Sequence, residues 1–188
     1  MKRIVMLGVA LLVAFSVVAV DAISVSASGD EFVVSKTGKV KSKATNTQRF
    51  KTSAGTIECT DASGSSEVTE LKSVTHKEVV TFGGCTGFGG NITISVADLE
   101  LNANGSAKLE KRVTIKPEGA GCEVRIEPQT FEGISFANAA GGKVTVELTM
   151  SAIHSKGTGG ECGGENNEGS YSGTISSELE SGTVEWKS

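Results

Sequence analysis

Four cysteines are the residues of this 188-residue chain whose type and spacing point most directly to chemistry. They are Cys59, Cys85, Cys122 and Cys162, and no two of them lie closer than 26 positions apart. Zinc sites usually bring cysteine ligands in close pairs, and thiol exchange usually uses a C-x-x-C motif. The spacing therefore disfavours a metal or redox site, and the even number predicts two disulfides formed in an oxidising compartment.

Four cysteines can pair in three ways, and the sequence alone excludes none of them. We favour Cys59 with Cys85 and Cys122 with Cys162, because each bridge then closes the shorter loop and joins neighbouring strands. In the chain-entropy model, cross-links over loops of these lengths stabilise a fold by about 3.5 to 4 kcal/mol each. That is a large share of the net stability of a typical domain.

The remaining polar residues give little indication of a hydrolytic site. Serine hydrolysis needs a serine beside an oriented histidine, but the segment Gly169–Gly173 places Tyr171 at the centre of a pattern that resembles G-x-S-x-G. We interpret the two histidines, His76 and His154, as surface or strand-end residues. Glycoside hydrolysis needs two carboxylates at a set separation, and the many acidic residues single out no pair. We therefore predict no catalytic residue and no cofactor.

Aromatic side chains, which often form carbohydrate-binding platforms, make up only 5% of the chain. Trp186 alternates with Val184, which predicts that it packs on a closing strand rather than on a ligand. Phe88 lies in a glycine-rich stretch beside Cys85. We interpret it as a lid over a disulfide, with an exposed contact residue as the alternative.

The segment Gly157–Gly169 gathers carboxylate and amide side chains among glycines around Cys162. These side chains belong to Glu161, Glu165, Asn166, Asn167 and Glu168. Ca²⁺ takes such oxygen ligands, but the spacing does not match the EF-hand loop. We therefore predict a solvated loop held by its disulfide, and no metal site.

The first 27 residues predict a secretory signal peptide. A basic start is followed by an apolar run of 17 residues from Ile4 to Val20, and small residues precede two plausible cleavage points, after Ala22 or after Ala27. The run is at the short limit for crossing a bilayer, so an uncleaved anchor is the alternative. After cleavage we expect no membrane span and a secreted or envelope-associated protein.

Cleavage at Ala27 would change the formal net charge from −4 to −5, because Lys2, Arg3 and Asp21 leave with the signal. An acidic protein of this kind is not expected to bind nucleic acid, which attracts clustered Lys and Arg. The segment Lys36–Lys51 is a local exception, with six basic residues among 16. We interpret it as a solvated strand face, and docking of an anionic envelope polymer is the alternative.

Alternation of apolar and polar residues with a period of two runs through most of the chain, for example at Ile92–Val96, Val144–Met150 and Tyr171–Leu179. Glycine-rich turn signals separate these segments. The pattern predicts an all-β protein: an antiparallel β-sandwich or barrel-like fold of about ten to twelve short strands, stapled by two disulfides. We expect one domain, residues 28–188.

Local signals add detail to this fold. Cys59 shares the parity of Ile57, and Cys122 shares that of Val124 and Ile126, so both sulfurs should point into the core. A change of parity predicts a β-bulge at Ala97–Asp98. Asn104–Gly105 predicts a hairpin with a type I′ turn, and a helical turn is the alternative to a strand at Ile134–Ala140.

The cysteine and turn positions are similar to those of a known group of proteins. The segments that carry the similarity are Thr56–Thr60, Val80–Thr86, Ala120–Ile126 with Gln129, and Cys162 followed by Ser170–Gly173. They resemble exported, Thr/Ser/Gly-rich proteins of unknown function that are common in soil actinobacteria. The resemblance implies export and a β architecture, and it implies no activity.

Together these observations predict a secreted or envelope-associated β-domain that acts as a binding or structural surface module without catalytic activity. Its partner would be an extracellular or envelope molecule, which the residues do not identify. A small secreted hydrolase with an acidic cleft is the alternative. A deep cleft with convergent titratable side chains would favour the hydrolase, and a continuous polar surface would favour the module.

Overall fold

The computed structural model describes residues 29–52 and 54–188, and most of these residues lie in β-strands. The predicted signal peptide, residues 1–27, lies outside the described residues. The first eight strands are β1 (Glu31–Val34), β2 (Gly38–Ala44), β3 (Gln48–Thr52), β4 (Gly55–Val68), β5 (Lys72–Ser73), β6 (Thr75–Gly87), β7 (Gly90–Ile94) and β8 (Ala97–Asn102). The others are β9 (Ser106–Leu109), β10 (Val113–Pro117), β11 (Glu123–Ile126), β12 (Thr130–Glu132), β13 (Ile134–Ala139), β14 (Lys143–Thr158), β15 (Gly164–Leu179) and β16 (Val184–Lys187).

The predicted all-β class is confirmed, since the described residues contain no α-helix and only one short 3-10 turn, η1 (Gly160–Cys162). The sixteen strands exceed the expected ten to twelve. Very short strands such as β5, with two residues, are too short to show an alternating pattern. By contrast, β4, β6, β14 and β15 have 13 to 16 residues each, and they run through both ends of the main sheet.

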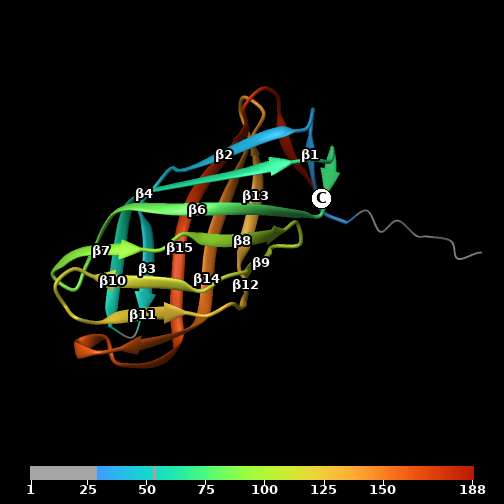
Figure 1. Ribbon diagram of the computed structural model, residues 1–188. Helices are drawn as coiled ribbons and strands as arrows, with labels where there is room; N and C mark the ends of the chain where they lie inside the picture. The colour runs from blue at the N-terminus through green and yellow to red at the C-terminus, as the bar shows by residue number, and fades with distance from the viewer. Residues whose placement is uncertain (1–28, 53) are drawn as a thin grey trace, which may run out of the picture.

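Antiparallel pairing closes the main sheet on itself (Figure 1). At one end the circuit runs through β3, β4, β6, β7, β10, β11, β14 and β15, and β15 pairs again with β3. At the other end the four long strands join β2, β8, β9 and the β12–β13 segment. The fold is therefore closed and barrel-like, and its interior is the core.

The second circuit closes at Gly133, where the chain bends from β12, paired with β9, into β13, paired with β14. Gly133 has a φ of 91°, and its carbonyl accepts a hydrogen bond from the N–H of Thr149 at 2.7 Å. A Cβ on Gly133 would lie 2.3 Å from the Thr149 carbonyl oxygen, so the bend requires glycine. The segment Ile134–Ala140 thus contributes a strand, not a helical turn.

Three short strands, in the order β16–β1–β5, form a cap over one end of the closed sheet. β1 pairs with β16 along its whole length, with Phe32 opposite Trp186. Phe32 also meets Phe136 of β13 edge to face, with ring centroids 5.0 Å apart, and so ties the cap to the main sheet. In Figure 1 the cap lies beside the C-terminus, and β7, β10 and β11 extend to the opposite end.

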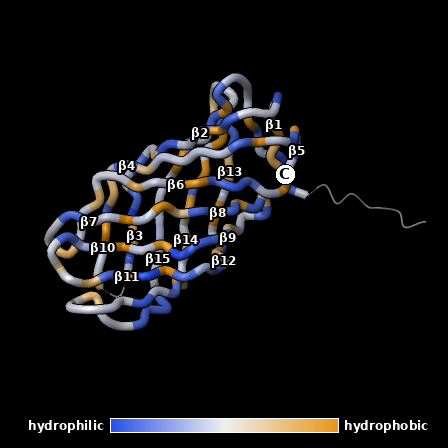
Figure 2. The backbone as a smooth tube through the Cα atoms, in the orientation of Figure 1, coloured by the Kyte–Doolittle hydropathy of each residue, from blue (hydrophilic) through white to orange (hydrophobic). Residues whose placement is uncertain are grey.

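Hydrophilic and hydrophobic residues alternate along the strands, as Figure 2 shows. The inward-facing residues near the cap differ between the two sides of the interior. On β15, β2, β4 and β6 they include, beside apolar residues such as Val40 and Leu179, a polar cluster that we call the polar wall: Ser177, Ser42, Gly64, Ser66, His76 and Glu78. On β8, β9, β13 and β14 they form an apolar wall of Leu101, Leu109, Ile134, Phe136, Val146 and Leu148.

Along β6 and along the β7–β8 segment paired with it, the set of alternate residues that faces the interior changes, and it changes at the same level of the sheet. Cys85 lies opposite Ile92 and Val80 lies opposite Ala97, so the two strands advance by the same number of residues. The predicted bulge at Ala97–Asp98 is therefore wrong. Both strands change face together, so the parity shifts without an inserted residue.

The hairpin predicted at Asn104–Gly105 is confirmed, but its turn type is not. Asn102 and Ser106 form the last pair, which leaves three residues in the turn, and only Gly105 has a positive φ, 87°. The side-chain oxygen of Asn104 accepts hydrogen bonds from the backbone N–H and the hydroxyl of Ser106, at 3.1 and 2.9 Å. This Asx contact stabilises the longer turn instead of a type I′ turn.

The favoured disulfide pairing is confirmed: Cys59 is joined to Cys85 and Cys122 to Cys162. The first bridge links directly opposite residues of β4 and β6, and Cys59 is fully buried, as its parity predicted. The second bridge links the start of β11 to η1. Two disulfides are typical of proteins that fold in an oxidising environment. Within the described ranges, no helix is long and apolar enough to span a bilayer.

Candidate functional site

The outer face of β2 carries a row of lysines above a groove. Lys39, Lys41 and Lys43 occupy alternate positions of β2, so all three point outward, and consecutive ones are spaced by about 6.6 to 6.8 Å along the strand. The groove spans β14, β15, β2 and β4, and we call it the lysine groove. Its lining comprises Lys39, Lys41, Ser42, Lys43, Ala44, Thr45, Asp61, Ser63, Gly64, Ser65, Lys143, Ser176 and Glu178.

Small residues, mainly serine, alanine and glycine, line the floor of the groove, and the lysine side chains project beside them. Lys43 lies between Ser63 on β4 and Ser176 on β15 in the cross-strand register. The hydroxyl of Ser63 is 3.0 Å from that of Thr81 on β6, which continues the hydroxyl row across the next strand. An anion placed on Lys43 would therefore meet an ammonium group flanked by hydroxyl donors.

Two of the four groove lysines have a carboxylate partner. Lys41 lies 2.6 Å from Glu180, and Lys143 lies 2.5 Å from Glu178. The hydrogen bond and the charge of Glu180 raise the pKa of Lys41, so this lysine stays protonated at neutral pH. Among the described residues, Lys39 and Lys43 form no ion pair.

The outer face of β10 and β11 makes a useful contrast, because there each cation has an acidic partner. Arg112 binds Glu127 at 2.8 Å, and Arg125 binds Glu123. Lys116 lies 3.6 Å from Glu123, whose pKa these cations lower, mainly through the hydrogen bond from Arg125. Charge on this face is neutralised internally, whereas Lys39 and Lys43 of the lysine groove form no ion pair within the described residues, and Lys39 acts on Glu180 only as a more distant charge.

Inside the sheet, the polar wall lies directly behind the lysine groove. The hydroxyls of Ser42 and Ser177 are 2.8 Å apart. Glu78 is only 3% exposed, and burial raises the pKa of its carboxyl group. Its side chain lies over Gly64, where a Cβ would come 2.0 Å from Oε1 of Glu78.

His76 also belongs to this wall: as the second residue of β6 it lies at a strand end, as predicted, but it is half-buried rather than on the surface. Its Nε2 lies 3.0 Å from the hydroxyl of Ser66, and its ring packs near Phe32 of the cap. Burial lowers the pKa of His76 to about 4. The histidine is therefore neutral at neutral pH and acts as an interior hydrogen-bonding group. His154, by contrast, is exposed, as predicted.

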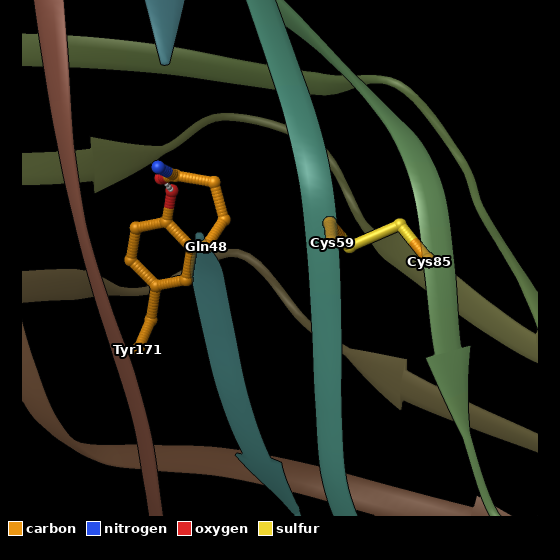
Figure 3. The surroundings of a disulfide bond; sticks show 4 residues. All are labelled: Gln48, Cys59, Cys85 and Tyr171. Atoms are coloured by element: carbon orange, nitrogen blue, oxygen red, sulfur yellow. Dashed lines mark hydrogen bonds between the residues drawn. A yellow bond between two sulfur atoms is a disulfide. The ribbon is translucent and has the colours of Figure 1, made fainter. Parts of the chain in front are cut away.

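A second buried polar contact fastens the β2–β3 turn to β15 near the first disulfide (Figure 3). The hydroxyl of Tyr171 donates to Oε1 of Gln48 at 2.5 Å, and Nε2 of Gln48 donates to the Asn46 carbonyl at 2.8 Å. Burial raises the pKa of Tyr171, so the phenol remains a donor. Gly173 leaves the space for Gln48, since a Cβ there would lie 1.9 Å from Oε1.

The aromatic residues singled out by sequence have structural surroundings. Trp186 packs 6.1 Å from Phe136 between ring centroids, and its indole N–H donates to the Ala103 carbonyl at 3.3 Å, so it closes the cap as predicted. Phe88 is 38% exposed, and its ring lies 3.2 Å from the position of a Cβ on Gly55. Phe88 thus packs over Gly55 at the start of β4.

The segment Gly157–Gly169 is mostly a strand hairpin rather than the predicted solvated loop. β14 continues to Thr158 and β15 begins at Gly164, with η1 between them. Lys156 binds Glu165 across the hairpin at 3.2 Å. In the part of the chain that the structure describes, no three His, Cys, Asp or Glu side chains gather closely enough to hold a metal ion.

Sequence reasoning missed Glu78 as an interior residue. Its parity with Val80 was available as a signal, because His76, Glu78 and Val80 alternate along β6. The exposed Val79, at 46%, obscured it, since the two faces of β6 have similar hydropathy in sequence. Comparison of the chain with protein-family models, with curated proteins and with solved structures finds no match.

Proposed function

We propose that this chain is an exported, non-catalytic binding module that holds an anionic polymer of the cell envelope or its surroundings in the lysine groove. The observation that carries the proposal is the pair of groove lysines, Lys39 and Lys43, that form no ion pair within the described residues. An exposed ammonium group without an internal partner can bind an anion without first giving up an ion pair, so such groups favour a charged ligand.

Three further features support this function. The two disulfides suit an oxidising compartment, and residues 1–27 read as a signal peptide cleaved after Ala22 or Ala27. The groove runs across four strands, which gives an extended ligand several contacts at once. The hydrolase alternative gains no specific support there, because of the two carboxylates in the groove Glu178 is bound to Lys143, and Asp61 has no second unpaired carboxylate beside it in the lining.

Binding to dextran sulfate, with uncharged dextran as the reference polymer, tests the proposal. We expect the purified, oxidised protein to bind dextran sulfate in titration calorimetry at low ionic strength and to lose affinity as salt is added. The K39E/K43E double variant should bind at least about tenfold more weakly, a difference of about 1.4 kcal/mol.

The matched control is the K36E/K51E double variant. Lys36 and Lys51 belong to the same basic segment and are exposed, but they do not line the groove. Both double variants change the net charge equally, so only the groove variant should lose most of its affinity. Equal loss in both would show that net charge alone attracts the polymer, and absence of wild-type binding would refute the proposed function.

A further inference from the structure

The outward-facing residues at the level of Lys43 form a row that crosses five strands. Lys43 on β2 lies opposite Ser63 on β4 and Ser176 on β15. The row continues to Thr81 on β6, opposite Ser63, and to Thr145 on β14, opposite Ser176. One ammonium group therefore stands at the centre of the row, with two hydroxyl-bearing residues on each side.

The other two lysines of β2 have acidic neighbours. Lys41 binds Glu180 at 2.6 Å. Lys39 lies opposite Glu67 of β4, and its carbonyl accepts a hydrogen bond from the backbone N–H of Glu180 at 2.9 Å, which places a second acidic residue beside it. Lys43, by contrast, has neutral residues at both cross-strand positions. An acidic group of a ligand therefore meets the least competition from the protein's own carboxylates at Lys43.

The spacing of the row suits a sugar chain that lies across the strands. Neighbouring strands are about 4.7 to 4.9 Å apart, so a hydroxyl-bearing residue lies about one such spacing to either side of Lys43. One pyranose unit of an extended polysaccharide advances by a similar length. An acidic sugar bound to Lys43 would therefore place its two neighbouring sugars on Ser63 and Ser176.

The groove also has room for a short stretch of such a chain. Its volume is about 720 Å³, and typical ligand sites hold about 300 to 1,000 Å³. The two cavities in the interior of the closed sheet hold only about 30 and 50 Å³, too little for a sugar. A saccharide ligand therefore fits on the outer face and not in the core.

Two carboxylates beside the row limit how densely charged the ligand can be. Asp61 lies on β4 two positions before Ser63, and Glu178 lies on β15 two positions after Ser176. Both line the groove, and such diagonal neighbours of Lys43 are about 7 to 8 Å from it between Cα atoms. Among the described residues Asp61 forms no ion pair. Further anions next to Lys43 would be repelled there, whereas the hydroxyl groups of neutral sugars can donate to these carboxylates.

We propose that the ligand of the lysine groove is an acidic polysaccharide in which uronate sugars alternate with neutral sugars, and that it lies across the strands with one uronate carboxylate on Lys43. The hydroxyl groups of Ser63 and Ser176 bind the neutral sugars on either side. This inference rests on the proposed function. It adds the chemical class of the ligand, its direction on the sheet and the lysine that makes the main contact.

Two octasaccharides of different charge density test the class of ligand in titration calorimetry on the oxidised protein. In the hyaluronan octasaccharide every second sugar carries a carboxylate, and in octagalacturonate every sugar does. We expect wild type to bind the hyaluronan fragment at least about tenfold more tightly, although it carries half the charge. Equal or tighter binding of octagalacturonate would contradict the alternating pattern.

Two single variants of equal charge locate the acidic sugar. K43Q should lower the affinity for the hyaluronan octasaccharide by at least about tenfold, whereas K39Q should lower it by less than about threefold. A ligand that ran along β2 instead of across the strands would contact both lysines. Equal losses in the two variants would therefore overturn the proposed direction.

A double variant tests the hydroxyl contacts. S63A/S176A should weaken binding of the hyaluronan octasaccharide by about tenfold. Its control is S135A/S172A, because Ser135 and Ser172 are exposed strand residues outside the groove lining, and this variant should bind as wild type does. Wild-type affinity in S63A/S176A would remove the hydroxyl row from the site.

Dextran sulfate separates failure of this inference from failure of the proposed function. If wild type binds dextran sulfate but shows neither a preference for the hyaluronan octasaccharide nor a difference between K43Q and K39Q, the groove accepts anionic polymers in general and only the inference fails. If wild type binds neither dextran sulfate nor the two octasaccharides, the proposed function fails with it.

Discussion

The two walls of the interior are stabilised in different ways. The apolar wall buries large side chains such as Leu148, which is 2% exposed, and it depends on close packing. The polar wall pairs its groups instead, with Ser42 on Ser177 and Ser66 on His76, and accommodates Glu78 over a glycine. The difference teaches that one side of the closed sheet is stabilised by apolar packing alone, whereas the other also contains a buried polar cluster and carries the lysine groove on its outer face.

The largest expected effect is on the apolar wall. The L148A variant should lower the free energy of unfolding by about 2 to 5 kcal/mol, because it removes buried apolar volume and leaves a cavity. The S42A variant on the polar wall should cost less, about 1 to 2 kcal/mol, through its lost hydrogen bond with Ser177. Urea unfolding of both variants measures this. A larger cost for S42A than for L148A would reverse the comparison.

An intermediate effect should appear as pH dependence on the polar wall. The pKa of His76 is about 4 in the folded chain and 6.5 when unperturbed, so the unfolded chain binds more protons between these values. Stability should therefore fall as pH falls through this window, by up to about 3 kcal/mol. The raised pKa of Glu78 acts in the opposite direction, since the folded chain takes up that proton first.

Variants isolate the histidine from the opposing carboxyl group. The loss of unfolding free energy between about pH 7 and about pH 4.5 should be clearly smaller in H76Q than in wild type. The exposed His154 supplies the control, and H154Q should follow the wild-type curve. Identical curves for wild type and H76Q would show that His76 titrates as it does in the unfolded chain.

The smallest of the three effects concerns Gly64, which leaves space for the side chain of Glu78. A methyl group on Gly64 would lie 2.0 Å from Oε1 and 2.5 Å from Cδ of Glu78, so G64A should cost about 1 to 3 kcal/mol by overpacking. A Cβ on Gly90 would meet nothing within 4 Å, and G90A should change stability by less than about 0.5 kcal/mol. Thermal unfolding compares the two. Equal stability of G64A and G90A would mean that Glu78 moves aside freely.

The alternation of inward- and outward-facing residues along the strands explains which predictions from the sequence were correct. Alternation identified the strands and placed Cys59 in the core, and loop length favoured the correct pairing of sulfurs. Closure of the sheet was not accessible, because β15 pairs with both β2 and β3 far away in the chain, and no local pattern records such contacts. The bulge at Ala97–Asp98 failed for a related reason, since the face change depends on the partner strand.

The candidate site and the polar wall behind it were predicted only in part. The basic segment was recognised, and Lys39 and Lys43 are exposed as expected, but the groove depends on the neighbouring strands that supply Ser63 and Ser176. Glu78 was missed because a charged residue in an alternating strand is typical of the wet face. Its inward position follows from packing against Gly64, and one strand alone cannot show that packing.

The contact between Ser42 and Ser177 joins residues 135 positions apart. A circuit that depends on such a contact cannot form while synthesis or translocation still withholds β15. Folding should therefore be late and slow relative to chains with local contacts, and the unfinished sheet should stay open until nearly all of the polypeptide has emerged. β15, one of the last strands of the chain, is therefore the strand that completes the closed sheet.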